Sequence, residues 1–328
     1  MQLVKITTVI YILFFKYCYT YVIEKVTKAL QHAEGPFWCP ETRNLLYVDT
    51  FKSTLHRINI DNKKEKQPIL LKNHRSIGFV IPINCTKERY LVFADHDVYD
   101  LRWSSNMTLL KKILTIEENK PKNQFNEGKA DNRGRVWAGT LTRMENLGVA
   151  LGGGSLYMID NKLKVNLKLT NLSISNGLVW NKNFTKFYFI DSQTKNVDEY
   201  NYKEKSGTIS KRRTVINIED AGFEGIPDGL NIDLNGNLWV ALFGGHYVLQ
   251  VHPVTGEIIR KIKMPATYIT SVIWGGNNFE TLFVSTSRLW LNREQLEKEP
   301  DAGSIFAVKG LGVKGLRLNM AKIKNMKA

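Results

Sequence analysis

The chain has 328 residues, of which 43% are hydrophobic and 11% aromatic, so it is long and apolar enough to bury a sizeable core. Its formal net charge is +15, but the basic residues are spread along the chain with only short clusters, such as residues 211–213. This dispersal indicates a solvated basic surface, so no nucleic-acid partner is predicted. There is no Pro- or Ser-rich linker, which favours one domain over two.

Residues 1–20 have the composition of a secretory signal peptide. Lys5 is basic, residues 6–15 are largely apolar, and residues 18–20 end the segment near a predicted cleavage point. An apolar stretch of about ten residues is too short for a bilayer, which takes about 20; a buried first strand or an uncleaved anchor is the alternative. We therefore expect a secreted chain of residues 21–328 with no stable membrane insertion. Four N-x-S/T sequons predict glycosylation at Asn84, Asn106, Asn171 and Asn183.

Short runs rich in aromatic and β-branched residues recur along the chain and predict strands. They begin at Leu45, Leu91, Val136, Phe187, Leu238 and Leu282. Successive starts are 44 to 51 residues apart, close to the length of a β-propeller blade, which needs about 40 to 50 residues for four strands. There is no long helix-period segment after the N-terminus. The sequence predicts an all-β, six-bladed β-propeller over residues 21–328, and disfavours a TIM barrel or a doubly wound sheet.

Two cysteines remain if the signal peptide removes Cys18. Cys39 and Cys85 form an even pair, and in an oxidising compartment such a pair predicts one disulfide that joins the first blade to the second. Two buried free thiols are the alternative. Neither cysteine lies in the setting of a catalytic nucleophile.

Oxygen-bearing side chains precede a glycine in four segments. The pairs are Glu34-Gly35, Glu127-Gly128, Asn176-Gly177 and Asp228-Gly229. Counted from the following strand, Glu34, Asn126, Asn176 and Asp228 all lie 10 or 11 residues upstream. Equivalent positions in successive blades form a ring at one mouth of the central channel, so we expect these side chains to face one cavity. A single such pair is typical of a β-turn, but the shared phase favours a common site.

The set Glu34, Asn176 and Asp228 offers two carboxylates and one amide carbonyl. Oxygen ligands of this kind suit one hard divalent cation, Ca²⁺, Mg²⁺ or Mn²⁺, and also admit Zn²⁺. Three protein ligands leave coordination positions for water and substrate. The sequence alone does not choose among these metals.

Other motifs point to no further chemistry. The string GLGVKG at 310–315 matches a dinucleotide fingerprint, but no helix follows it and no βαβ unit surrounds it. The six histidines show no zinc-protease spacing, and no G-x-S-x-G element is present. Covalent acyl-enzyme chemistry therefore has no support in the sequence.

Five segments carry a resemblance to a known family: AEGPFW at 33–38, FNEGKADNRGRVWAGT at 125–140, ISNGLVW at 174–180, IPDGLNIDLNGNLWVA at 226–241 and GLGVKG at 310–315. They resemble the regucalcin (senescence marker protein) and gluconolactonase family, especially the insect branch that includes luciferin-regenerating enzyme. The similarity covers nearly all of the chain after about residue 25. It implies a six-bladed propeller, which agrees with the repeat.

The resemblance also implies roles for the oxygen ligands. Glu34, Asn176 and Asp228 are expected to bind one divalent metal in the central channel. Asn126 is expected to contact both the substrate and the metal site. Asp228 corresponds to the residue proposed as general base in lactone hydrolysis. The chemistry is coherent, since a cation can polarise the ring carbonyl while a carboxylate takes a proton from attacking water.

Three positions depart from the family pattern near the expected substrate pocket. Gln124 stands where the family usually has arginine, which removes a charged donor fork for hydroxyl-rich substrates. Glu127 stands where aspartate is usual. In the stretch from Gly139 to Glu145, a substrate-contacting acid is displaced or missing, and Met144 occupies this part of the predicted pocket.

These observations favour a secreted, divalent-metal-dependent, lactonase-like hydrolase with Asp228 as general base. The predicted substrate-binding residues are Gln124, Asn126, Glu127 and Met144, and the expected partner is a small-molecule lactone or related ligand other than a simple aldonolactone. A non-catalytic, secreted calcium- or ligand-binding propeller is the alternative. The sequence leaves the oligomeric state open.

Overall fold

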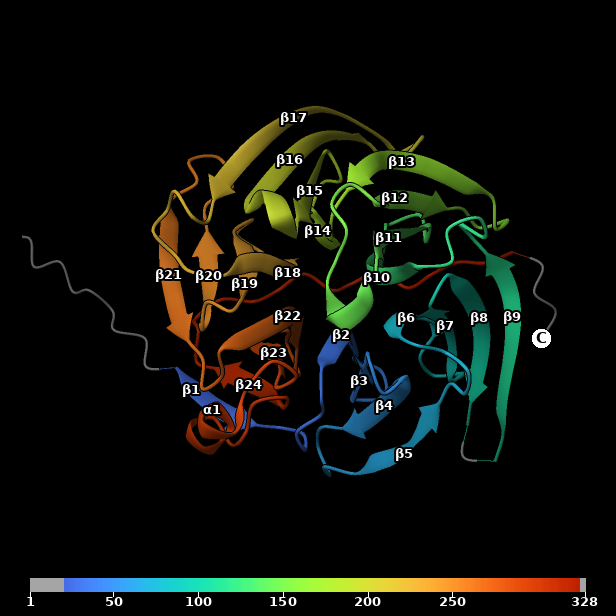
Figure 1. Cartoon of the computed structure of the whole chain (residues 1–328), viewed down its shortest axis with the longest axis horizontal. Coiled ribbons are helices and arrows are strands. Elements are labelled where there is room, and N and C mark those ends of the chain that lie inside the picture. Colours follow the sequence, from blue (N-terminus) through green and yellow to red (C-terminus); the bar gives the residue numbers. More distant parts are fainter. Residues whose placement is uncertain (1–20, 105, 325–328) are drawn as a thin grey trace, which may run out of the picture.

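The computed structural model describes residues 21–104 and 106–324. Its strands form antiparallel sheets that are arranged radially around a central axis (Figure 1). Four sheets have four strands each, and a fifth has eight. The predicted signal peptide lies outside the described residues. No helix in the described ranges is long and apolar enough to cross a membrane.

Each four-stranded sheet is a meander of consecutive strands. The first contains β2 (Ala33–Cys39), β3 (Asn44–Asp49), β4 (Thr54–Asn59) and β5 (Glu65–Leu70). The second contains β6 (Ile77–Asn84), β7 (Arg89–Ala94), β8 (Asp97–Trp103) and β9 (Thr108–Thr115). The third contains β10 (Asn123–Ala130), β11 (Val136–Thr142), β12 (Gly154–Ile159) and β13 (Val165–Leu172). The fourth contains β14 (Ser175–Trp180), β15 (Lys186–Asp191), β16 (Asn196–Lys203) and β17 (Thr208–Asn217).

The eight-stranded sheet contains the first and the last strand of the described residues. One half consists of β18 (Ile226–Ile232), β19 (Leu238–Phe243), β20 (Tyr247–Val251) and β21 (Ile258–Lys263). The other consists of β22 (Tyr268–Gly275), β23 (Thr281–Ser287), β24 (Ile305–Lys309) and β1 (Val22–Lys25). The single pair Phe243 and Tyr268 joins the halves. The prediction of an all-β propeller is confirmed, whereas the count of six blades stays a prediction because this sheet is continuous.

The helical elements among the described residues are short. They are the 3-10 turns η1 (Glu145–Leu147) and η2 (Ser192–Thr194) and the helix α1 (Arg293–Lys298). The six predicted strand runs coincide with β3, β7, β11, β15, β19 and β23, the second strand of each four-strand unit. The residues that begin these runs are fully or almost fully buried, so the recurring pattern follows the packing of sheet against sheet.

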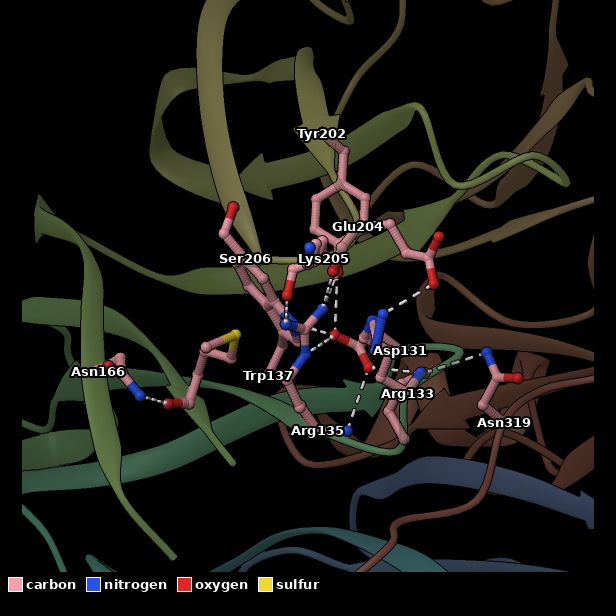
Figure 2. A network of polar contacts seen from close by, with 12 residues as sticks. Asp131, Arg133, Arg135, Trp137, Asn166, Tyr202, Glu204, Lys205, Ser206 and Asn319 are labelled. Carbon is pink, nitrogen blue, oxygen red and sulfur yellow. Dashed lines mark hydrogen bonds and ion pairs between the residues drawn. The ribbon is translucent and has the colours of Figure 1, made fainter. Parts of the chain in front are cut away.

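A repeated aspartate–tryptophan turn fixes the hairpin between an inner strand and the next strand. In Figure 2, the buried Asp131 carboxylate accepts hydrogen bonds from Arg135 Nε (2.6 Å), Trp137 Nε1 (3.2 Å) and Tyr202 Oη (2.9 Å). Tyr202 belongs to β16, so this carboxylate ties the third sheet to the fourth. Asp233 repeats the arrangement and accepts from Trp239 Nε1 at 2.9 Å. Because both carboxylates are buried, their full satisfaction is a requirement of the fold.

A disulfide between Cys39 and Cys85 joins the first sheet to the second, with the two Cα atoms 5.9 Å apart. Cys39 is the last residue of β2, and Cys85 directly follows β6. Both side chains are buried within one hydrophobic cluster. The bond closes a sequence separation of 46 residues, which restricts the unfolded chain.

Replacing both cysteines, Cys39→Ser with Cys85→Ser, is expected to lower the free energy of unfolding by about 2–4 kcal/mol, because the unfolded chain regains loop entropy. Urea denaturation of the oxidised wild type and of the double variant measures the difference. Intact mass after alkylation without reductant checks that the wild type has no free thiol at these positions. Two labelled thiols in the wild type, or equal denaturation midpoints, would contradict the expectation.

Candidate functional site

The four oxygen side chains that the sequence singled out lie on four inner strands. Glu34 is on β2, Asn126 on β10, Asn176 on β14 and Asp228 on β18. The register with the following strand shifts at each of these places, so each strand carries a β-bulge there. A bulge locally redirects the side chains of a strand. The alternative of isolated β-turns is therefore wrong for these segments.

Close approach of neighbouring inner strands explains why glycine follows the oxygen side chain. A Cβ placed on Gly177 would lie 2.5 Å from the backbone oxygen of Asp228, well inside van der Waals contact. The backbone of β14 can therefore pack against β18 only without a side chain at this position. This approach brings Asn176 and Asp228 to the same place at the channel mouth.

Glu34, Asn126, Asn176 and Asp228 line one cavity of about 270 Å³. The amide groups of the two asparagines are anchored from behind: Asn126 Nδ2 donates to Ser175 O (3.2 Å), and Asn176 Nδ2 donates to Ser192 Oγ (3.0 Å). An amide nitrogen held in this way leaves the carbonyl oxygen as the free group of the side chain. The cavity therefore combines two carboxylates with two amide oxygens.

The Glu34 and Asp228 carboxyls, called here the carboxylate pair, are in an electrostatically unfavourable setting. Burial and then the Glu127 charge raise the pKa of Glu34 to about 8, against opposing effects from the Gly35 N–H and Lys129. Burial, followed by Glu34 and Glu127, raises the pKa of Asp228 well above its usual range. A bound divalent cation would offset both the cost of burying the two charges and their mutual repulsion. The donor set thus fits the divalent cation that the resemblance implies.

Glu127 and Lys129 form a second buried pair beside the cavity. Lys129 Nζ lies 3.4 Å from Glu127 Oε1 and also donates to the Leu230 carbonyl. Burial raises the pKa of Glu127, and Lys129 opposes this effect. The second carboxylate oxygen, Oε2, is buried and has no hydrogen-bond partner among the described residues. Glu127 does not line the cavity, so it acts on the site through its charge.

Two further aspartates fix the backbone just before two of the strands that carry the candidate metal ligands. The Asp49 carboxylate, at the end of β3, accepts from the backbone N–H groups of Gln31 (2.9 Å) and His32 (3.2 Å), which lie three and two residues before Glu34. Asp191, at the end of β15, accepts in the same way from Ser173 and Ile174, three and two residues before Asn176. We infer that both aspartates position a site residue. In the sequence, each of these aspartates directly follows a predicted strand run, but this position alone does not indicate that it orients a site residue.

The upper part of the cavity is aromatic. The side chains of His32, Phe51, Phe243 and Trp290 line it, and we call them the aromatic box. His32 lies 5.1 Å from Phe51 and 5.4 Å from Trp290, and Phe243 lies 5.1 Å from Trp290, measured between ring centroids. Burial and then the Arg143 charge lower the pKa of His32 to about 3. The histidine ring is therefore neutral at physiological pH.

Arg143 was missed as a site residue by the sequence analysis. Leu141 and Arg143 both line the cavity, whereas Met144 is 46% exposed and does not. Side chains alternate along an extended chain, and the backbone stays extended past the end of β11 through the bridge between Arg143 and Val149. This alternation from Leu141 was the signal available in the sequence.

The predicted substrate residues are thus only partly assembled at the cavity. Asn126 lines it, but Gln124, Glu127 and Met144 do not. Gln124 is buried on β10, and its Nε2 has no hydrogen-bond partner within the described structure. The position at which the family pattern has arginine thus holds a buried, neutral amide in this chain, which removes the charged donor fork.

Comparisons with known proteins agree with this geometry. A sequence profile described as "SMP-30/Gluconolactonase/LRE-like region" matches residues 32–288. Regucalcin of Danio rerio is 34% identical over 283 residues, covering 86% of this chain and 92% of that protein. The structure of a luciferin-regenerating enzyme matches with a TM-score of 0.86 and 32% identity, covering 93% of this chain and 100% of that one. A calcium-binding regucalcin from Agrobacterium tumefaciens has the same fold, with a TM-score of 0.81 at 20% identity over 93% of this chain and 98% of that one. By profile, identity and coverage, the chain belongs to the SMP-30, regucalcin and gluconolactonase family, as the motif resemblance predicted.

Proposed function

We propose that this protein is a divalent-metal-dependent, lactonase-like hydrolase. Membership of the family supports either a lactonase-like or a calcium-binding protein. The observation that carries the proposal is the carboxylate pair, Glu34 and Asp228, buried together in a cavity that also offers the oxygens of Asn126 and Asn176. Two carboxylates without a cation are costly to bury, so such a pair is expected where a cation belongs.

Glu34, Asn176 and Asp228 would hold the cation, with Ca²⁺, Mg²⁺, Mn²⁺ and Zn²⁺ as candidates. When bound, it supplies positive charge that polarises a lactone carbonyl. Asp228 accepts the proton of the attacking water, because its carboxylate lines the cavity and is held by the Asn176 amide. Asn126 orients the substrate through its free amide oxygen, and the aromatic box limits the access of water.

The non-catalytic alternative is a calcium- or ligand-binding propeller. It is favoured by Gln124, since the usual charged donor is absent and the glutamine lies outside the cavity lining. The hydrolase and the calcium-binding propeller both require the cation. They differ in whether Asp228 is needed for turnover or only for binding.

The metal prediction is tested by calorimetric titration of chelator-treated protein with each of the four cations. Asp228→Asn and Glu34→Gln remove a charged ligand each and are expected to weaken binding by at least about 10- to 100-fold, the range found even for outer-shell partners. Asp61→Asn, an exposed carboxylate paired with Arg43, is the matched control. A lactone panel then assays turnover. If the wild type turns over a lactone and the ligand variants lose both metal binding and turnover, the hydrolase is supported. If the wild type binds the cation but turns over none of the lactones, the alternative is supported.

The same titration should depend on pH. The pKa of Glu34 is raised to about 8 in the metal-free protein, so protons compete with the cation, and affinity is expected to rise with pH up to that value. By linkage, protonation of Glu34 stabilises the metal-free fold. This stabilisation is fully present below the pKa that Glu34 has in the unfolded chain, and it is lost as the pH rises towards 8. Glu34→Gln should make both profiles less steep and leave the part that comes from Asp228. Profiles that are unchanged in this variant would contradict the assignment.

Asp49 offers a test of positioning without touching a ligand. Asp49→Asn must turn its amide NH₂ towards one of the two backbone N–H groups that the carboxylate now accepts. Metal affinity is expected to fall by about 10- to 100-fold, and the effect should come from the loop before Glu34. Calorimetry against Asp61→Asn measures it. Equal affinities in the two variants would show that this loop does not depend on Asp49.

We further propose that the eight-stranded sheet is two blades that share one residue pair, which gives six blades.

We also propose that the chain is exported. The Cys39–Cys85 disulfide supports an oxidising compartment. Among the sequons, Asn106, Asn171 and Asn183 are exposed, whereas Asn84 is half-buried.

Protein secreted from eukaryotic cells is expected to begin near residue 21 and to lose mass on treatment with an N-glycosidase. N-terminal sequencing and intact mass check both points. A chain that begins at Met1 and has no removable glycan would sink the export proposal.

A further inference from the structure

The wall of the cavity above the carboxylate pair is apolar and built from four separate segments. His32 precedes β2, Phe51 follows β3, Phe243 ends β19 and Trp290 follows β23. Trp290 stands nearly perpendicular to its three neighbours in the aromatic box, at interplanar angles of 78°, 82° and 87°. Its ring is still 37% exposed. An aromatic side chain this exposed at a cavity leaves ring surface for a further aromatic partner.

Few polar groups are available for a hydroxyl-rich ligand. Apart from the carboxylate pair and the two anchored asparagines, the polar side chains among the described residues that line the cavity are His32, Arg143, Ser192 and Gln193. The remaining lining side chains are aromatic or aliphatic, including Leu141, Ile174 and Ile226. Each buried sugar hydroxyl would need its own partner. This wall therefore suits a planar, apolar ligand better than a sugar lactone.

Arg143 adds one positive charge to this wall. Its guanidinium carbon lies 5.2 Å from the centroid of the Phe51 ring, and Nη1 donates to the Leu147 carbonyl at 2.8 Å. Nε is buried and has no hydrogen-bond partner in the described part of the chain. Burial lowers the pKa of Arg143 to about 10, so it remains charged at neutral pH. A partly buried cation with an unused donor favours an anionic group on the ligand.

We propose that the substrate is a planar, aromatic lactone or aryl ester that carries one negative charge, with its ring in the aromatic box and its anionic group against Arg143. This inference rests on the proposed function of the same cavity. In the metal-loaded site, a divalent cation balances the carboxylate pair, and the charge of Arg143 is then balanced by the substrate. The reacting carbonyl lies between the two, near Asp228.

The test compares three probes in chelator-treated wild-type protein: coumarin-3-carboxylate, the neutral and nearly isosteric coumarin-3-carboxamide, and glucono-δ-lactone. Calorimetry measures each affinity, so neither metal nor turnover is required. The carboxylate is expected to bind at least about ten-fold more tightly than the carboxamide, because a charge-assisted hydrogen bond replaces a neutral one. Glucono-δ-lactone should bind most weakly. A carboxamide that binds as well as the carboxylate, or a sugar lactone that binds better than both, would overturn the proposal.

Variants assign the preference to named side chains. Arg143→Gln should reduce the carboxylate to the affinity of the carboxamide, and Trp290→Ala should weaken both coumarins by about two- to ten-fold. Arg133→Gln, which removes an arginine that is 47% exposed and paired with Glu204, is the matched control and should change nothing. Circular dichroism confirms folding, and the wild-type comparison stands if a variant fails to fold.

A final arm separates this inference from the proposed function. The carboxylate titration is repeated in Ca²⁺-loaded protein. If the preference appears only with Ca²⁺ and survives Arg143→Gln, then the cation holds the anion and the role of Arg143 is overturned, while the metal site stands. If none of the four candidate cations binds but the preference persists in metal-free protein, the proposed function fails and the ligand class stands.

Discussion

Close backbone packing of the inner strands is the constraint on which the rest of the molecule depends. Each inner strand, β2, β6, β10, β14, β18 and β22, contacts the inner strands on both sides of it. Glycine makes this possible at the narrowest points: a Cβ on Gly78 would lie 2.8 Å from the Phe125 carbonyl, and one on Gly229 would lie 2.3 Å from Ser271 Oγ. Because the strands are this close, the side chains next to these glycines lie close together around the central channel.

That convergence has an electrostatic cost, which the fold confines to one place. The carboxylate pair and Glu127 are all buried near the channel. Burial raises the pKa of each of the three carboxyls, and the Glu127 charge raises the pKa of both members of the pair further. Lys129 offsets part of this charge and is itself buried. One lysine cannot neutralise three carboxylates, so the ionised form of the site favours additional positive charge. This charge imbalance supports the proposed cation.

The sequence predicted those features that repeat with the blade period. The strand runs and the phase of Glu34, Asn176 and Asp228 recur at regular intervals, so their meeting at the axis followed from the repeat alone. The blade count stays a prediction, because the pair Phe243 and Tyr268 joins two halves into a continuous sheet. Side-chain direction was harder to predict. The extended chain after β11 places Arg143, and not the predicted Met144, in the lining of the cavity. The bulge in β10, between Phe125 and Gly128, similarly makes the direction of Glu127 hard to predict, since a one-residue shift of register moves side chains to the opposite face.

The pairing of β1 with β24 has a consequence for how the chain folds. Val22 pairs with Lys309 and Lys25 with Phe306, so the first described strand to leave the ribosome finds its partner only after almost the whole chain has been made. Until then β1 and the open edge of the ring present unpaired N–H and C=O groups, which are templates for pairing with another chain. Contacts this distant in sequence also slow folding, because loop-closure entropy is lost before they form. The ring is therefore most open to aggregation during synthesis, before β1 can pair with β24.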